Sequence, residues 1–133
     1  MKVMIDTNIM ISSILFPNSL SSKAFIKSLL PPFEAITSDY IITELKDKFN
    51  EKFSNHLDDL NQFLSVALES IEIISTPQEI NMAENNIRDI KDRPILRAAI
   101  LANVDYILTG DKDFLESGIS KPVCISASEF IKL

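Results

Sequence analysis

Lys2-Val3-Met4-Ile5-Asp6-Thr7-Asn8 is the stretch of sequence that decides the fold. It is a short apolar run that ends in a carboxylate, a hydroxyl and an amide. A second run of the same kind, Asp105-Tyr106-Ile107-Leu108-Thr109-Gly110-Asp111-Lys112-Asp113, lies near the other end of the chain. If both runs are strands of one parallel sheet, their polar residues lie at its carboxyl edge, where open α/β sheets bind ligands. The two stretches therefore predict a site assembled from both ends of the chain.

The size and composition are those of one soluble globular domain spanning residues 1–133. The chain is 46% hydrophobic and 24% charged, and 133 residues are enough to bury a substantial core. Cys124 is the single cysteine, which excludes an internal disulfide and favours a reducing compartment. No apolar run approaches the roughly 20 residues that span a bilayer. We therefore expect a cytoplasmic protein without a membrane partner.

The net charge of −6 and the isoelectric point near 4.7 argue against binding of nucleic acid through bulk positive charge. A nucleic-acid enzyme is not excluded, because bound divalent cations can reverse the sign of an acidic pocket. The acidity is informative only if the carboxylates converge.

Hydrophobic periodicity predicts strands that alternate with helices along the chain. Strands are expected at residues 3–5, 34–37, 71–74, 106–109 and 123–126. Helices are expected over residues 9–16, 20–29, 39–53, 57–70, 78–86 and 92–102, and after residue 126. Short apolar strands alternating with helices indicate a parallel sheet covered on both faces. The predicted fold class is α/β, a three-layer α/β/α sandwich with a parallel sheet of about five strands.

Four acidic residues from separate segments are expected to meet at one edge of this sheet. Asp6 follows the first strand, and Asp111 follows the fourth. Glu44 lies in the helix after the second strand, and helical side chains lean toward the N-terminus of their helix, hence toward the same edge. Asp92 opens the helix that leads into the fourth strand.

Carboxylates that lie this close raise one another's pKa and destabilise the fold unless a cation lies among them. Oxygen ligands without cysteine or histidine select Mg²⁺ or Mn²⁺ rather than Zn²⁺. Such ions activate water and neutralise the charge of a phosphodiester under attack. Asn8 and Thr109 add neutral groups that can hold water or phosphate oxygens.

Each acid also has a simpler interpretation. Asp92 could be only a helix N-cap, and Glu44 only a helix surface residue. Asp111 and Asp113 lie in a Gly-Asp-Lys-Asp segment that turn chemistry also explains. Asp6 is harder to explain in this way, since acids that end a buried strand are uncommon. The joint pattern favours function.

With these residues in place, the chain resembles PIN-domain proteins of the bacterial and archaeal toxin type. The resemblance runs along the whole chain and has four motifs in order: Val3-Met4-Ile5-Asp6-Thr7-Asn8, Tyr40-Ile41-Ile42-Thr43-Glu44-Leu45, Asp92-Arg93-Pro94-Ile95-Leu96 and Tyr106-Ile107-Leu108-Thr109-Gly110-Asp111-Lys112-Asp113-Phe114. It implies a metal-dependent endoribonuclease, commonly the toxin of a toxin–antitoxin pair, and a homo-oligomer such as a dimer.

Carried over position by position, the resemblance implies the acidic quartet Asp6, Glu44, Asp92 and Asp111, with Asn8, Thr109 and Asp113 as accessory polar groups. In this interpretation Asp6, Asp92 and Asp111 hold Mg²⁺ or Mn²⁺, and Glu44 orients a water or acts as its base. Arg93, Arg97 and Lys112 are candidate contacts to RNA. Single-stranded or looped RNA is the expected substrate, because in-line attack needs a backbone that can be splayed.

Two other functions stay open at this point. One is a PIN-type scaffold that does not cleave and instead binds RNA or a protein partner. The other is a Mg²⁺-dependent phosphoacceptor signalling module, which needs an acid after the third strand, where this chain has Ser75-Thr76. A dehalogenase-like phosphatase needs a second aspartate at position 8, which is asparagine.

Overall fold

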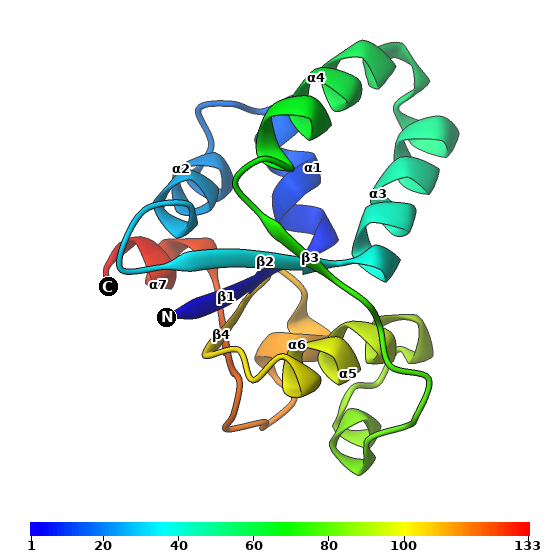
Figure 1. The fold of residues 1–133 in the computed structure, drawn as a ribbon, viewed down its shortest axis with the longest axis vertical. Coiled ribbons are helices and arrows are strands. Elements are labelled where there is room, and N and C mark those ends of the chain that lie inside the picture. Colours follow the sequence, from blue (N-terminus) through cyan, green and yellow to red (C-terminus); the bar gives the residue numbers. More distant parts are fainter.

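Five short strands form one parallel sheet in the computed structural model, which describes residues 1–133 (Figure 1). The strands are β1 (Lys2–Ile5), β2 (Glu34–Ser38), β3 (Glu72–Ile74), β4 (Tyr106–Leu108) and β5 (Val123–Ile125). Their spatial order is β3-β2-β1-β4-β5, and every neighbouring pair is parallel. Helices cover both sides of the sheet, which confirms the predicted three-layer α/β/α sandwich.

Strand β1 is the centre of the sheet and of the core. Val3, Met4 and Ile5 are completely buried. The chain adds β2 and β3 on one side of β1, then returns to add β4 and β5 on the other side. Right-handed crossovers therefore leave β1 and β4 toward opposite faces of the sheet, and the carboxyl ends of these two strands mark its topological switch point.

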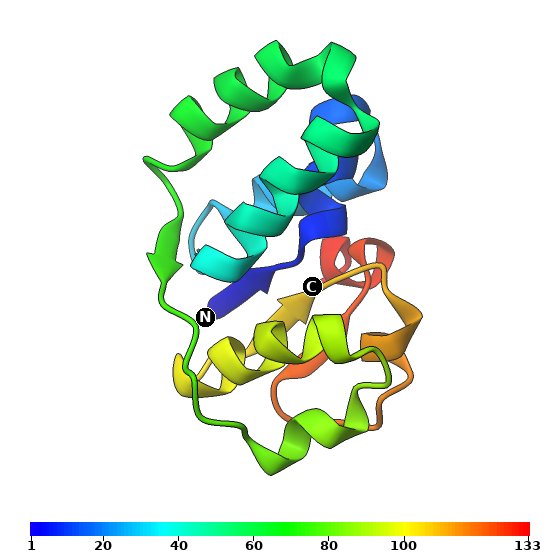
Figure 2. The ribbon, with the colours of Figure 1, turned by 90° about the vertical axis from the view of Figure 1, so that its right-hand side faces the viewer.

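The helices separate into two layers. They are α1 (Thr7–Leu15), α2 (Leu20–Ser28), α3 (Asp39–Lys52), α4 (Leu57–Ala67), α5 (Arg93–Leu101), α6 (Lys112–Leu115) and α7 (Ala127–Ile131), with 3₁₀ turns η1 (Ser54–His56), η2 (Met82–Asn86) and η3 (Ile90–Asp92). Helices α1 to α4 lie on one side of the sheet, and α5 and α6 lie on the other (Figures 1 and 2). No single helix is long and apolar enough to cross a membrane; α1 and α2 reach that length and composition only as a pair bent by 115°.

Local signals in the sequence explain several helix boundaries. The Ser19 hydroxyl accepts a hydrogen bond from the Ser22 amide and caps α2, and the Ser38 hydroxyl does the same for the Ile41 amide of α3. The apolar face of α3 is buried at Ile41 and Leu45.

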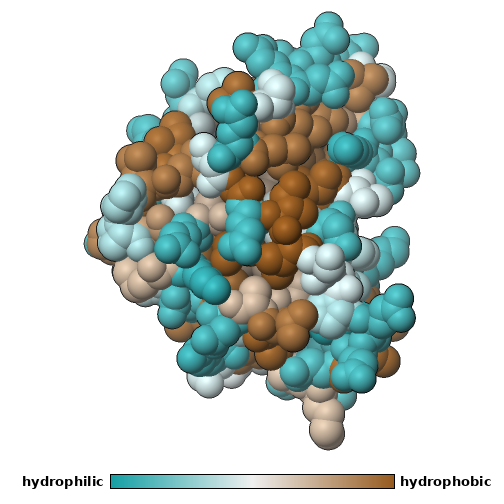
Figure 3. Space-filling view, viewed as in Figure 1, coloured by the Kyte–Doolittle hydropathy of each residue, from teal (hydrophilic) through white to brown (hydrophobic).

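Three details of the predicted elements are wrong. Residues 78–86 do not form a helix: only the 3₁₀ turn η2 forms, closed by a capping box between Asn81 and Glu84. The Gly-Asp-Lys-Asp segment, read as a turn, opens the short helix α6. The sheet is also not covered throughout, because Glu72 and Ile73 of the edge strand β3 are exposed. Figure 3 shows a continuous apolar area between α4 and the strands β2 and β3.

The long connection from β3 to α5, residues 75–92, is held in place by polar contacts. The Arg97 guanidinium donates to both carboxylate oxygens of Glu84 at 2.9 Å and to the carbonyl of Pro77 at 3.1 Å. The Glu84 side chain is 3% exposed, and that of Arg97 is 16% exposed. At the start of the connection, the Asp39 carboxylate accepts hydrogen bonds from the amide and the hydroxyl of Thr76. These contacts fix the segment that leads to Asp92.

We predict that Glu84→Gln lowers the free energy of unfolding by about 2 kcal/mol, because it leaves the Arg97 charge without its partner in a mostly buried position. The neighbouring exposed Glu79→Gln is the control and should change it by less than about 0.5 kcal/mol. Urea unfolding of both variants measures the difference. Equal stability of the two variants would show that the pair does not hold the connection.

Candidate active site

Asp6 is a buried carboxylate at the end of β1, with 3% of its surface exposed. The Thr7 amide donates to its Oδ1 at 2.7 Å, which caps α1, and the Thr109 hydroxyl donates to its Oδ2 at 2.7 Å. The pKa of Asp6 is raised to about 6, chiefly by burial. The two hydrogen bonds lower this pKa, and the negative charges of Glu44 and Asp111 raise it slightly further.

Thr109 joins the two central strand ends. The register pairs Ile5 with Leu108, so the next residues of β1 and β4 are neighbours. The completely buried Thr109 hydroxyl donates to Asp6 and accepts a hydrogen bond from the Asp111 amide at 3.0 Å. One hydroxyl therefore positions two of the acidic residues that the sequence singled out.

Glu44 reaches the same place from α3. The Thr7 hydroxyl donates a hydrogen bond to its Oε1, and its negative charge acts on Asp6. Glu44 is half-buried rather than a freely solvated helix residue. The simpler interpretation as a surface residue is therefore wrong, and Thr7 is a contact that the sequence prediction missed.

Asp92 occupies the N-cap position of α5, but its side chain makes no capping hydrogen bond, so capping does not explain its carboxylate. Partial burial raises the pKa of Asp92 to about 8, together with a hydrogen bond to the Asp111 side chain and the negative charges of Asp111, Asp6 and Asp89. The Asp111 Oδ1 caps α6 by accepting from the Asp113 amide at 2.9 Å, and Asp111 is also a neighbour of Asp92.

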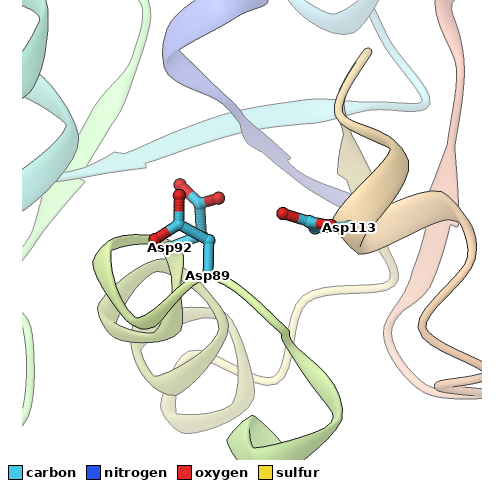
Figure 4. Close-up of side chains that lie close together, drawn as sticks. All are labelled: Asp89, Asp92 and Asp113. Carbon is cyan, nitrogen blue, oxygen red and sulfur yellow. The ribbon is translucent and has the colours of Figure 1, made fainter.

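Asp92 also belongs to a second group of acids, with Asp89 and Asp113, whose side chains lie close together (Figure 4). One carboxylate oxygen of each lies within 4.8 Å of the others. Asp89 was not predicted, although its spacing from Asp92 is a signal. Asp89 caps the 3₁₀ turn η3 and lies three residues before Asp92, and residues three apart in a 3₁₀ turn are eclipsed, so their side chains lie on the same side. Asp113 is also paired with Arg88 at 2.7 Å.

The three basic side chains proposed from sequence lie in different surroundings. Arg97 is held by Glu84 and belongs to the framework of the connection. The Arg93 Nε donates to the Ile87 carbonyl at 2.9 Å. Lys112 is exposed and lines a polar hollow of about 150 Å³ with Arg88, which is itself 80% exposed and was not predicted. Asn8 is exposed in the first turn of α1.

The donor set suits a hard divalent cation. The converging side chains offer carboxylate and hydroxyl oxygens and no sulfur or imidazole, which is the preference of Mg²⁺ and Mn²⁺. Burial raises the pKa of Asp6 and of Asp92, and repulsion from neighbouring carboxylates raises both further. A cation at this place would relieve that repulsion.

Comparison with known families and proteins agrees with this geometry. The family model described as the PIN domain matches residues 2–113, a range that contains all of the acids above. An uncharacterised protein of Methanocaldococcus jannaschii is 31% identical over 117 residues, which are 86% of this chain and 73% of that protein.

Solved structures with a similar fold come from toxin–antitoxin complexes. VapBC2 from Rickettsia felis, bound to a DNA fragment from its promoter, contains a chain with a TM-score of 0.69 and 21% identity, covering 95% of this chain and 98% of that one. VapBC-1 from nontypeable Haemophilus influenzae gives 0.68 and 18%, covering 96% and 99%. A toxin–antitoxin complex from Klebsiella pneumoniae gives 0.60 and 24%, covering 94% and 97%.

We predict that Asp92→Asn stabilises the metal-free protein increasingly as the pH rises from 4 to 8. The pKa of Asp92 is raised in the folded state from 3.8 to about 8, so the native protein retains a proton that the unfolded chain releases in this range. The wild type therefore keeps its full stability below pH 4 and loses the contribution of this proton as the pH rises toward 8, whereas asparagine cannot lose a proton.

The expected gain of Asp92→Asn over wild type at pH 8 is roughly 1 kcal/mol after allowance for solvent screening. Thermal unfolding in EDTA at several pH values measures it, with the exposed Asp58→Asn on α4 as the control. A difference that is constant across this pH range would contradict the raised pKa.

Proposed function

We propose that this chain, which belongs to the PIN-domain family, is a Mg²⁺- or Mn²⁺-dependent endoribonuclease. The observation that carries this proposal is the convergence of Asp6, Glu44, Asp92 and Asp111 at the carboxyl ends of β1 and β4. Asp6 and Asp111 each cap a helix, but capping does not require carboxylates from four segments at one edge of the sheet, where like charges help to raise the pKa of Asp6 and Asp92. A reaction that depends on a bound divalent cation accounts for these carboxylates lying close together.

In the proposed mechanism, Asp6, Asp92 and Asp111 would hold the cation directly or through water. A bound Mg²⁺ or Mn²⁺ would supply an activated water and neutralise the charge of the scissile phosphate. Glu44 would orient a water or accept a proton at its Oε2, which has no partner within the chain, because Thr7 occupies its Oε1. The Thr109 hydroxyl positions Asp6 and Asp111 by donating to the Asp6 carboxylate and accepting from the Asp111 amide.

The proposed substrate is single-stranded or looped RNA. An acidic protein needs local positive charge to hold a phosphate backbone, and Lys112 and Arg88 provide it next to Asp113. Arg93 remains a candidate contact, while Arg97 is already committed to Glu84. An unpaired strand can be splayed over the carboxylates, whereas a duplex cannot.

We further propose that the protein is the toxin of a toxin–antitoxin pair. Its fold matches chains from VapBC complexes over nearly their whole length. By the same likeness we expect an antitoxin protein as partner and a homodimer. Action on cellular RNA would place the protein in the cytoplasm.

Millimolar Mn²⁺ or Mg²⁺ should raise the melting temperature of the wild type by several degrees, because the ion binds only the folded state. Asp6→Asn should remove most of this shift, and Asp58→Asn should retain it. Differential scanning fluorimetry with and without EDTA measures the effect. A wild type insensitive to both ions would show that the carboxylates do not form a working metal site.

Purified wild-type protein should cleave a mixture of single-stranded and structured RNA in Mg²⁺ or Mn²⁺. EDTA, Asp6→Asn and Asp111→Asn should each reduce the rate at least 100-fold, as expected for loss of a group that acts in the transition state. Asp58→Asn should cleave like the wild type. Gel analysis of end-labelled RNA checks the prediction.

Cleavage that persists in the two site variants would point to a contaminating nuclease. Ion binding without cleavage of any RNA would favour a non-cleaving PIN scaffold that binds RNA or a protein partner. The absence of both would contradict the enzymatic proposal.

A further inference from the structure

A hollow of about 260 Å³ borders the site on the side of α3. It is lined by Tyr40, Thr43, Glu44, Asp47, Lys48, Glu51 and Lys91. Six of these residues lie on one face of α3, because they are spaced by three, four and seven positions, and from Tyr40 to Glu51 the helix rises about 16 Å. Lys91 closes the hollow from the turn that leads to Asp92. The hollow therefore begins at a proposed catalytic group and extends away from it.

Tyr40 is the aromatic wall of this hollow. Its hydroxyl donates a hydrogen bond to the Lys91 carbonyl, which holds the ring between α3 and the turn η3. The negative charges of Glu44, Asp92 and Asp89 act on this hydroxyl, so the ring lies beside the carboxylates. Tyr40 is only partly buried. A fixed, accessible ring next to a phosphodiester-cleaving site is what a stacking platform for a base requires.

The other side chains that line the hollow can hydrogen-bond to a base that carries an amino group. Asp47 and Glu51 present carboxylates, which only accept hydrogen bonds, and adenine, cytosine and guanine each offer an exocyclic amine. Uracil has no such amine. Lys48 and Lys91 place two ammonium groups at the same hollow, where the phosphates that flank a bound base can meet them.

We propose that this hollow is a subsite for one unpaired, amino-bearing nucleobase of the RNA substrate, which stacks on Tyr40 and is read by Asp47 and Glu51. The proposal rests on the proposed ribonuclease function and adds a substrate preference to it. A nucleobase suits the lining better than a phosphate does. Three carboxylates line the hollow and would repel a negatively charged phosphate, whereas a nucleobase is uncharged. The lysines then contact the backbone on either side of the base.

The test compares Tyr40→Leu with Tyr40→Phe, since both lose the hydroxyl and only the second keeps the ring. Each change is made in the Asp111→Asn background, which prevents turnover and leaves the hollow intact. Fluorescence anisotropy in Mg²⁺ measures the binding of fluorescein-labelled oligo(A), oligo(C) and oligo(U), each six nucleotides long. Circular dichroism and melting temperature establish that both variants fold.

We expect oligo(A) and oligo(C) to bind at least fivefold more tightly than oligo(U). Tyr40→Leu should weaken the binding of oligo(A) about tenfold, while Tyr40→Phe stays within twofold of its parent. Asp47→Asn and Glu51→Gln, which change exposed side chains, should reduce the preference over oligo(U). Asp58→Asn on α4 should leave affinity and preference unchanged.

Equal losses in Tyr40→Leu and Tyr40→Phe would overturn the subsite, because the hydroxyl and not the ring would then matter. Unchanged RNA affinity in Tyr40→Leu, Asp47→Asn and Glu51→Gln would also overturn it and leave the hollow to a protein partner. Cleavage by the wild type, measured on the same RNAs, distinguishes failure of the subsite from failure of the ribonuclease function. Cleavage with no effect of Tyr40→Leu rejects only the subsite, whereas absent cleavage rejects the ribonuclease function while the binding series still tests the base preference.

Discussion

The pairing of β1 with β4 is the constraint on which the rest of the structure depends. These strands are far apart in sequence, and their register places Ile5 beside Leu108 and therefore Asp6 beside Thr109. The connections that follow the two strands leave toward opposite faces of the sheet, which opens the edge between them. Every other element of the site is brought to this edge: Glu44 by α3, Asp92 by the turn before α5, and Asp111 by the start of α6.

Holding these acids together opposes folding, and the surrounding structure offsets the cost. Burial is the main cause of the raised pKa values of Asp6 and Asp92, and repulsion between the carboxylates adds to it. Against it stand a core of 28 buried apolar residues and the polar contacts that fix the connection 75–92, chiefly the Arg97–Glu84 pair.

The overall negative charge is compatible with the proposed RNA substrate because basic side chains lie close to the carboxylates. Arg88 and Lys112 lie on the α6 side of the carboxylates, and Lys48 and Lys91 lie on the α3 side. The net charge of −6 limits nonspecific attraction to nucleic acid, so recognition would depend on these two flanks and on a cation between them.

The sequence by itself determined the fold class, the order of the strands along the chain and most of the helices, and it singled out the four acids of the proposed site, because periodicity and the residues that end each strand are local properties. It did not reveal that Thr7 bonds Glu44, that Arg97 is committed to Glu84, or that Tyr40 and Lys91 share a hollow. The helix expected over residues 78–86 was wrong because Asn81 and Glu84 close a 3₁₀ turn that Arg97 then holds. Which of several alternative roles a polar residue takes depends on partners far away in the chain, and only the tertiary structure decides which partners it has.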